Sequence, residues 1–278
     1  MRNVWFILLI VIALASCKSN TKQTANDTSS KILTNNLSKD LIKQFKPIIQ
    51  GVWVKSDYIS KVNKTKSPLA AADQATDITV MYINTDDING DSIIVPIGAG
   101  NHDGSNLTLK FIPGKNKSSI VFGDGELTYS IGHGDTILTF ADFDKEKKQF
   151  IKTQYVRSFK RQPNDDLADG MDYYINKILV AGNYTLTNSI GTKLKINLSE
   201  DGRVSGFLNC KTYMINIDLN SDVNDNLDGI YFKTADKENK NFSFKINADT
   251  LILYTTEENK DSTELIQDKL KYKLVRTK

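Results

Sequence analysis

Two parts of the chain share one order of hydrophobic patterns, in which a helical period leads into the alternation typical of β-strands. Apolar residues recur at helical spacing across residues 37–49 and again across residues 171–179. Runs of alternating and β-branched residues begin directly after them, at Gly51 and at Gly182. A period of about 3.6 indicates an amphipathic helix, and a period of about two indicates a half-buried strand. The pattern therefore predicts two halves, each with a short helix that leads into strands.

Turn signals divide the strand-like part of each half into short segments. They are Asn89-Gly90, Pro113-Gly114 and Asp124-Gly125 in the first half, and Asp201-Gly202 and Asp228-Gly229 in the second. Residues 107–111 and 194–198 alternate apolar with polar side chains, which gives each strand one buried and one solvated face. Many short strands at close intervals are typical of barrels and sandwiches. We therefore expect a mainly β protein with two tandem antiparallel β-barrel (lipocalin-like) domains, each preceded by a short helix.

A polar, proline-containing link follows the first set of strands and is the best candidate for a domain boundary. We place the first barrel domain at residues 31–161, a linker at residues 162–170 and the second barrel domain at residues 171–278. Each half also ends on a basic strand. An internal duplication is the economical explanation for this shared order.

Charge and cysteine content narrow the classes of partner. The chain holds 36 Lys plus Arg against 33 Asp plus Glu, and the lysines are scattered rather than clustered. This balance argues against a nucleic-acid partner, because such partners require a basic patch or stripe. The two cysteines are Cys17 and Cys210. We expect Cys210 to be a buried thiol that behaves as a small hydrophobe.

The N-terminal segment has the three-part layout of a secretory signal, with a basic start, an apolar run across residues 4–14, and Leu14-Ala15-Ser16-Cys17. The apolar run is too short for a membrane-spanning helix, which needs about 20 apolar residues. The four residues that end on Cys17 resemble the lipobox of bacterial lipoproteins. That resemblance implies cleavage of a signal peptide of residues 1–16 and acylation of Cys17. Residues 17–30 contain almost no apolar side chains, which predicts a flexible tether.

The resemblance to lipoproteins also implies a location. In that family, an Asp directly after the acylated Cys retains the protein at the inner membrane, and here the residue is Lys18. An acidic run after the Cys directs some lipoproteins to the cell surface, whereas this segment is polar and basic. The resemblance therefore implies a lipid-anchored protein of the outer membrane that faces the periplasm.

Each half begins its strands with Gly-x-aromatic and ends them with an arginine. The residues are Gly51, Trp53 and Arg157 in the first half, and Gly182, Tyr184 and Arg276 in the second. This combination resembles the lipocalin and fatty-acid-binding superfamily, and lipocalin-like lipoproteins of Gram-negative bacteria in particular. The resemblance implies that the aromatic ring plugs the closed end of an eight-stranded barrel and that the guanidinium stacks over it, which is a structural role. Residues 198–210 also resemble the strand-turn-strand of the bacterial META domain.

The first half carries an insertion at residues 60–76 that the second half lacks. Its Ser-Pro pair, followed by alanines, predicts the N-cap and first turn of a short helix. In fatty-acid-binding proteins a helical lid occupies the same place at the open end of the barrel, so the resemblance implies a lid over the first barrel. The alternative is a helix that plugs a closed, dry barrel. The ligand-binding candidates beneath a lid are Tyr58, Leu69 and Tyr82.

The sequence offers no set of residues that points to catalysis or to a metal. The two histidines, His102 and His133, stand in evident loops without a third ligand at a metal-binding spacing. No Ser or Cys has the sequence context of an activated nucleophile. We therefore expect no catalytic residues, no metal site, no cofactor and no enzymatic activity.

The sequence favours an envelope-anchored lipoprotein that binds a small amphiphilic ligand in the first barrel. The alternative is a structural or protein-interaction scaffold of the cell envelope, with closed and filled barrels. The expected partners are the membrane, through the N-terminal lipid, and either an amphiphile or an envelope protein. The packing of the first barrel discriminates between the two hypotheses, because a barrel filled with side chains leaves no room for a ligand.

Overall fold

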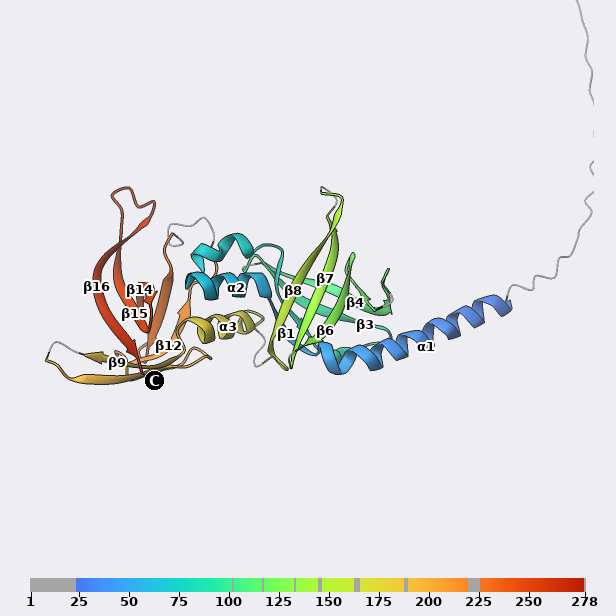
Figure 1. Ribbon diagram of the computed structural model, residues 1–278, viewed down its shortest axis with the longest axis horizontal. Helices are drawn as coiled ribbons and strands as arrows, with labels where there is room; N and C mark the ends of the chain where they lie inside the picture. Colours follow the sequence, from blue (N-terminus) through green and yellow to red (C-terminus); the bar gives the residue numbers. More distant parts are fainter. Residues whose placement is uncertain are drawn as a thin grey trace, which may run out of the picture.

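The computed structural model describes residues 24–101, 103–116, 118–132, 134–144, 147–162, 166–187, 190–219 and 226–277. The protein is mainly β and contains two eight-stranded antiparallel barrels, the first closed and the second nearly closed (Figure 1). A helix precedes each barrel. The fold class predicted from the sequence is therefore confirmed.

The first barrel is a meander in which each strand pairs with the next along the chain. Its elements are α1 (Thr24–Ile49), β1 (Gly51–Lys55), β2 (Ile78–Ile83), β3 (Ser92–Ala99), β4 (Asp103–Pro113), β5 (Ile120–Phe122), β6 (Gly125–Gly132), β7 (Asp135–Asp144) and β8 (Gln149–Phe159). Strand β8 pairs with β1 and closes the barrel. The connection between β1 and β2 holds α2 (Ser56–Thr65) and the 3-10 helix η1 (Leu69–Gln74), and a second 3-10 helix, η2 (Thr85–Asp87), follows β2.

The second barrel follows helix α3 (Asp169–Leu179). Its strands are β9 (Gly182–Thr187), β10 (Lys193–Leu198), β11 (Val204–Ser205), β12 (Cys210–Ile215), β13 (Gly229–Thr234), β14 (Asn239–Asn247), β15 (Thr250–Glu258) and β16 (Leu265–Arg276). They form a sheet in the order β11-β10-β9-β16-β15-β14-β13-β12, whose edges meet through a bridge between Arg203 and Thr212. Strand β11 has only 2 residues, so it offers β12 too few backbone groups for a full ladder. This barrel is therefore only nearly closed.

Alternation of side chains along the strands separates the inside of the first barrel from its outside. On β1, Trp53 belongs to the core inside the barrel, whereas Val52 and Val54 belong to a different core outside it. Helix α1 contributes Phe45 and Ile49 to the inside core. Helix α1 therefore closes the end of the barrel at which β1 starts.

The core outside the first barrel is shared with the second domain. It joins side chains of β1, β2 and β8 to α2, η1, α3 and the core of the second barrel. Figure 1 shows α2 and α3 between the two barrels. The Leu69 backbone N–H donates to Asp228 Oδ1 at 2.9 Å, and the Asn101 side-chain amide donates to the Ile217 carbonyl at 3.1 Å. The two barrels are thus joined by a common hydrophobic core and by hydrogen bonds.

Two element bounds differ from the predicted domain limits. Helix α1 begins inside residues 17–30, the predicted flexible tether. Once the packed part of a helix has formed, each further residue adds one backbone hydrogen bond, so the helix extends into polar sequence. Helix α3 begins inside residues 162–170, the predicted linker. The reason is the close packing of its first turn against β1, where a Cβ on Gly170 would lie 2.3 Å from Val52 Cγ1.

Candidate functional site

The residues predicted to close the first barrel meet at the junction of α1 and β1. The guanidinium carbon of Arg157 is 4.7 Å from the centre of the Trp53 ring. Trp53 is 0 % exposed, and its indole N–H donates to the Ile49 carbonyl at 2.8 Å. Arg157 Nη2 donates to the Ile48 carbonyl at 3.1 Å. Both donors therefore satisfy carbonyl groups at the C-terminal end of α1, where a helix leaves them without internal partners.

The second barrel has a matching set of contacts. The guanidinium carbon of Arg276 is 5.4 Å from the centre of the Tyr184 ring, and Arg276 Nη2 donates to the Tyr184 hydroxyl at 2.9 Å. The Tyr184 hydroxyl donates to the Val180 carbonyl at 2.7 Å, and Arg276 Nη2 donates to the Leu179 carbonyl at 3.1 Å. In both halves an aromatic side chain thus binds the carbonyl four residues before it, and an arginine binds the preceding carbonyl.

These contacts have a structural role. Both rings are buried in hydrophobic cores, and each arginine ties its ring to the end of the leading helix. A cation–π contact of this kind contributes about 0.5–2 kcal/mol. Gly51 makes the close approach of chain segments possible, because its φ is 139° and a Cβ there would lie 2.3 Å from the Phe159 carbonyl oxygen. These contacts therefore tie the closing aromatic ring of each barrel to the helix that leads into it.

The helical insert of the first half joins β1 to β2 at the mouth end of the first barrel, but it packs in the core shared with the second domain, and none of its residues lines the cavity, contrary to the predicted lid. Tyr58 on α2 is fully buried in the core shared with the second domain. Leu69 binds a side chain of the second domain through its backbone N–H, and Tyr82 packs against the shared core. These three predicted ligand-binding residues do not line the first-barrel cavity described below. The reason is the apolar face of α2, where Ile59 and Val62 lie beside Tyr58 and pack in that core.

A cavity of about 650 Å³, the first-barrel cavity, opens at the end of the barrel where β7 turns into β8. Its apolar walls come from β2, β3, β4, β7 and β8, and they consist of Ile78, Ile97, Leu107, Phe140, Ile151 and Tyr155. Trp53, Phe122 and Leu138 do not line it and are 0 % exposed, so side chains fill the rest of the barrel. Small-molecule sites commonly have about 300–1,000 Å³. The first barrel therefore combines a solid floor with an open mouth.

Carboxylates surround the opening of the first-barrel cavity. We call Asp77, Asp124, Asp142 and Asp144, which line it, the acidic rim. Lys147 also lines the cavity, and its Nζ lies 3.4 Å from Asp144 Oδ2. No Lys or Arg nitrogen of the described residues lies within 4.0 Å of the other three carboxylates. Among the described residues that line it, the mouth therefore carries more carboxylates than ammonium groups above an apolar wall.

Two polar side chains of β1 and β8 are tied to the start of β2 beside this cavity. Lys55 and Tyr155 are register partners. Lys55 Nζ donates to the Thr76 carbonyl at 2.9 Å, and the Tyr155 hydroxyl donates to the Ile78 carbonyl at 3.0 Å. Burial raises the pKa of Tyr155 above its usual range, and the charge of Asp77 raises it further. Tyr155 therefore remains a neutral hydrogen-bond donor that fixes one wall of the cavity.

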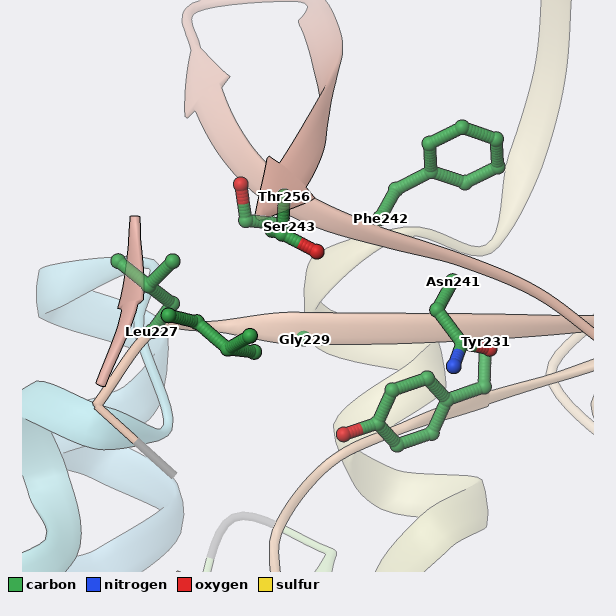
Figure 2. A pocket seen from close by; sticks show the side chains of 8 residues that line it. Leu227, Gly229, Tyr231, Asn241, Phe242, Ser243 and Thr256 are labelled. Carbon is green, nitrogen blue, oxygen red and sulfur yellow. The ribbon is translucent and has the colours of Figure 1, made fainter. Parts of the chain in front are cut away.

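A second cavity, of about 390 Å³, lies in the second domain (Figure 2). It is lined by Leu227, Gly229, Tyr231, Asn241, Phe242, Ser243, Thr256 and Leu265. Tyr231 and Asn241 are register partners, and Figure 2 shows their side chains close together. The Ser243 hydroxyl is buried and has no hydrogen-bond partner among the described residues. The groups that line this cavity are uncharged, which distinguishes it from the first-barrel cavity.

The remaining predicted residues lie elsewhere. Cys17, His102 and His133 lie outside the described residues. Cys210 is a buried free cysteine, and burial raises the pKa of its thiol above the usual value. Across the described ranges, no group of three or more His, Cys, Asp or Glu residues could hold a metal ion. No helix in the described part of the chain combines the length and the apolar character that crossing a membrane requires.

The sequence alone does not distinguish the acidic rim, because its residues also fit ordinary structural roles. Asp124 precedes a glycine and is typical of a turn, and Asp142 and Asp144 are typical of the polar face of a strand. What brings the residues of the acidic rim together is the meander topology of the barrel. Successive strands run in opposite directions, so the start of β2, the turn between β5 and β6, and the end of β7 meet at one end of the barrel.

Comparison with known proteins identifies no homologue. No family model matches the chain, and no curated protein or solved structure is significantly similar to it. The resemblances to lipocalins and to the META domain therefore rest on the residues quoted for them.

Proposed function

We propose that this protein is a non-enzymatic lipoprotein of the bacterial cell envelope that binds a small amphiphilic ligand in the first-barrel cavity. The observation that carries the proposal is a cavity of about 650 Å³ with apolar walls and a polar opening. An amphiphile matches this arrangement, because its apolar part can replace water against Leu107 and Phe140 while its polar end stays at the rim. The solid floor beneath the cavity limits the ligand to the upper part of the barrel.

The proposed membrane attachment rests on Leu14-Ala15-Ser16-Cys17, and the proposed outer-membrane position facing the periplasm rests on Lys18. Two or three acyl chains on one cysteine hold a protein stably, whereas one chain is marginal. Helix α1 has 26 residues, and at about 1.5 Å per residue it spans about 40 Å. Figure 1 shows much of α1 projecting from the first barrel. In this proposal α1 acts as a spacer between the lipid and the barrels.

The binding part of the proposal is tested by filling the cavity. Ala99 lines the cavity, so Ala99→Phe places a ring in it, and Leu194→Phe on an exposed part of β10 is the matched control. The protein is the mature chain with Cys17→Ala, so that no acyl group competes for the cavity. Isothermal titration with decyl amphiphiles below their micelle concentrations should show binding to the parent chain and to Leu194→Phe. Ala99→Phe should bind about tenfold more weakly, or about 1.4 kcal/mol. Equal affinity in all three proteins would refute binding in this cavity.

A scaffold for an envelope protein is the second candidate function. The observation that favours it is the packing of both barrels against one shared core, together with the filled floor of the first barrel. Ligand binding raises thermal stability by RT ln(1 + [L]/Kd), which is about 2.7 kcal/mol at a hundredfold excess over Kd. If a broad amphiphile panel produces neither heat of binding nor a rise in the unfolding temperature, the scaffold is favoured.

A further inference from the structure

We infer that the ligand of the first-barrel cavity carries a positive charge at its polar end. This inference rests on the proposed function and narrows it to amphiphiles with an amine or a quaternary ammonium group. Its basis is the position of the acidic rim directly around an apolar cavity. An apolar wall alone would accept any hydrocarbon tail, so the rim is what distinguishes one polar end from another.

Apart from the ion pair between Asp144 and Lys147, the rim holds Asp77, Asp124 and Asp142. No Lys or Arg nitrogen within the described part of the chain comes within 4.0 Å of these three carboxylates. They are contributed by separate segments, namely the start of β2, the turn after β5 and the end of β7. A cation at the opening can therefore be approached by negative charge from several sides.

Lys55 is another ammonium group at this end of the barrel. It is 7 % exposed, and it donates to the Thr76 carbonyl at 2.9 Å and to the Thr76 hydroxyl at 3.4 Å. These bonds direct its charge to the segment before β2, and Lys55 does not line the cavity. Within the described part of the chain, the four carboxylates of the rim still outnumber these two ammonium groups, Lys55 and Lys147.

The apolar walls strengthen the effect of the rim. Walls of low dielectric constant focus the field of the carboxylates into the opening, and opposite charges attract several times more strongly near a protein surface than in bulk water. An ammonium group at the rim gains this attraction while its hydrocarbon part lies against Phe140 and Leu107. A carboxylate or phosphate group at the same place is repelled. The geometry thus selects the sign of the ligand's charge.

The experiment compares three probes with the same tail, namely decyltrimethylammonium, decyl maltoside and decanoate. Each is titrated below its micelle concentration into the mature chain with Cys17→Ala. The cationic probe should bind about tenfold more tightly than decanoate, with the uncharged probe between them. Because the preference is electrostatic, it should shrink as salt is raised from low to high concentration.

The key variant combines Asp77→Asn, Asp124→Asn and Asp142→Asn. Asparagine keeps the local structure at each site. It tolerates the positive φ of 56° at residue 77 and favours the turn at residue 124. At residue 142 its oxygen can still accept the Phe143 N–H, which Asp142 accepts at 2.7 Å. The variant should bind the three probes with nearly equal affinity.

The matched control removes the same number of negative charges from exposed positions of the second barrel, through Asp236→Asn, Glu257→Gln and Glu258→Gln. It should keep the preference of the parent chain. Far-ultraviolet circular dichroism and thermal unfolding verify that both triple variants are folded. If the rim variant does not fold, the probe series and its salt dependence in the parent chain decide the inference.

The possible outcomes separate the inference from the proposed function. If none of the three probes binds the parent chain, the proposed function fails and the inference fails with it. If the probes bind with equal affinity, or decanoate binds most tightly, the proposed function stands and the inference is overturned. A cationic preference that survives in the rim variant also overturns the inference, because its source then lies outside the rim.

Discussion

The carboxyl group of Asp172 makes the junction between the barrels sensitive to pH. Asp172 lies on α3, and burial, followed by the nearby charges of Asp169 and Asp166, raises its pKa to about 7. In an unfolded chain the pKa of an aspartate is about 3.9. The native protein therefore binds this proton more tightly than the unfolded chain does. The contribution of Asp172 to stability is greatest below the unfolded pKa and is lost as pH rises through the folded pKa.

The size of the effect follows from the two pKa values. A pKa difference of one corresponds to about 1.36 kcal/mol, so a difference of about three sets an upper limit near 4 kcal/mol. Water reaches part of the carboxyl group, which reduces this limit to about 2–4 kcal/mol. Asp172→Asn retains the shape of the side chain but cannot ionise. We expect its free energy of unfolding to match the parent at about pH 4 and to exceed it by about 2–4 kcal/mol at about pH 8.

The assay is urea denaturation of the mature chain, followed by circular dichroism across this pH range. Other carboxyl groups also titrate, such as Asp228, whose pKa burial raises, and Asp201, whose pKa falls to about 2 beside Arg203. They are present in both proteins, so they cancel when the variant is compared with the parent. Asp236→Asn, at an exposed turn, is the control and should show no such pH dependence. A constant difference between Asp172→Asn and the parent at every pH would refute the reasoning from burial.

Three further predictions concern the barrel closures and the anchor. Arg157→Met and Arg276→Met should each lower the free energy of unfolding by about 2–4 kcal/mol, since each removes a cation–π contact and a charged hydrogen bond. Urea denaturation measures this loss, and values near zero would contradict a stabilising role. By the same assay, Gly51→Ala should lower the free energy of unfolding by about 3 kcal/mol or more, because a Cβ there would clash with a carbonyl oxygen. Gly90→Ala, which has open space around it, should lower it by about 1 kcal/mol. Equal losses would contradict the steric argument. Cys17→Ala should move the protein from the membrane pellet to the soluble fraction, and a variant that stays in the pellet after a salt wash would place the anchor elsewhere.

Much of the architecture follows from local sequence signals. Strand alternation and turn residues are set by backbone geometry over a few positions, so they predict an antiparallel β protein without knowledge of distant contacts. The contact between Trp53 and Arg157 could also be predicted from the sequence, because the resemblance places both residues on neighbouring strands. The contacts of Tyr184 and Arg276 repeat the pattern of those of Trp53 and Arg157, and the duplication itself stays a prediction.

The surface against which the insert packs could not be predicted from the sequence. The pattern of Tyr58, Ile59 and Val62 indicates that one face of α2 must be buried, but it does not identify the surface that buries it. Likewise, the outward positions Val52 and Val54 have apolar side chains that suit a β-strand buried on both faces. Only the folded structure shows that these two apolar surfaces are both covered at the junction with the second domain.

The energetics of the two available surfaces explain why the insert leaves the mouth open. Full burial of a Val, Ile or aromatic side chain contributes about 1.5–3 kcal/mol, and α2 buries Tyr58, Ile59 and Val62 in the shared core. A lid across the mouth would instead cover the acidic rim, and burying carboxylates without a cation costs several kcal/mol. The junction is therefore the favourable place for the apolar face of α2. Because of the same cost, the carboxylates of the rim need contact with water or with a cation. An apolar helix over the rim is therefore unfavourable, whereas a positively charged ligand there would be favourable.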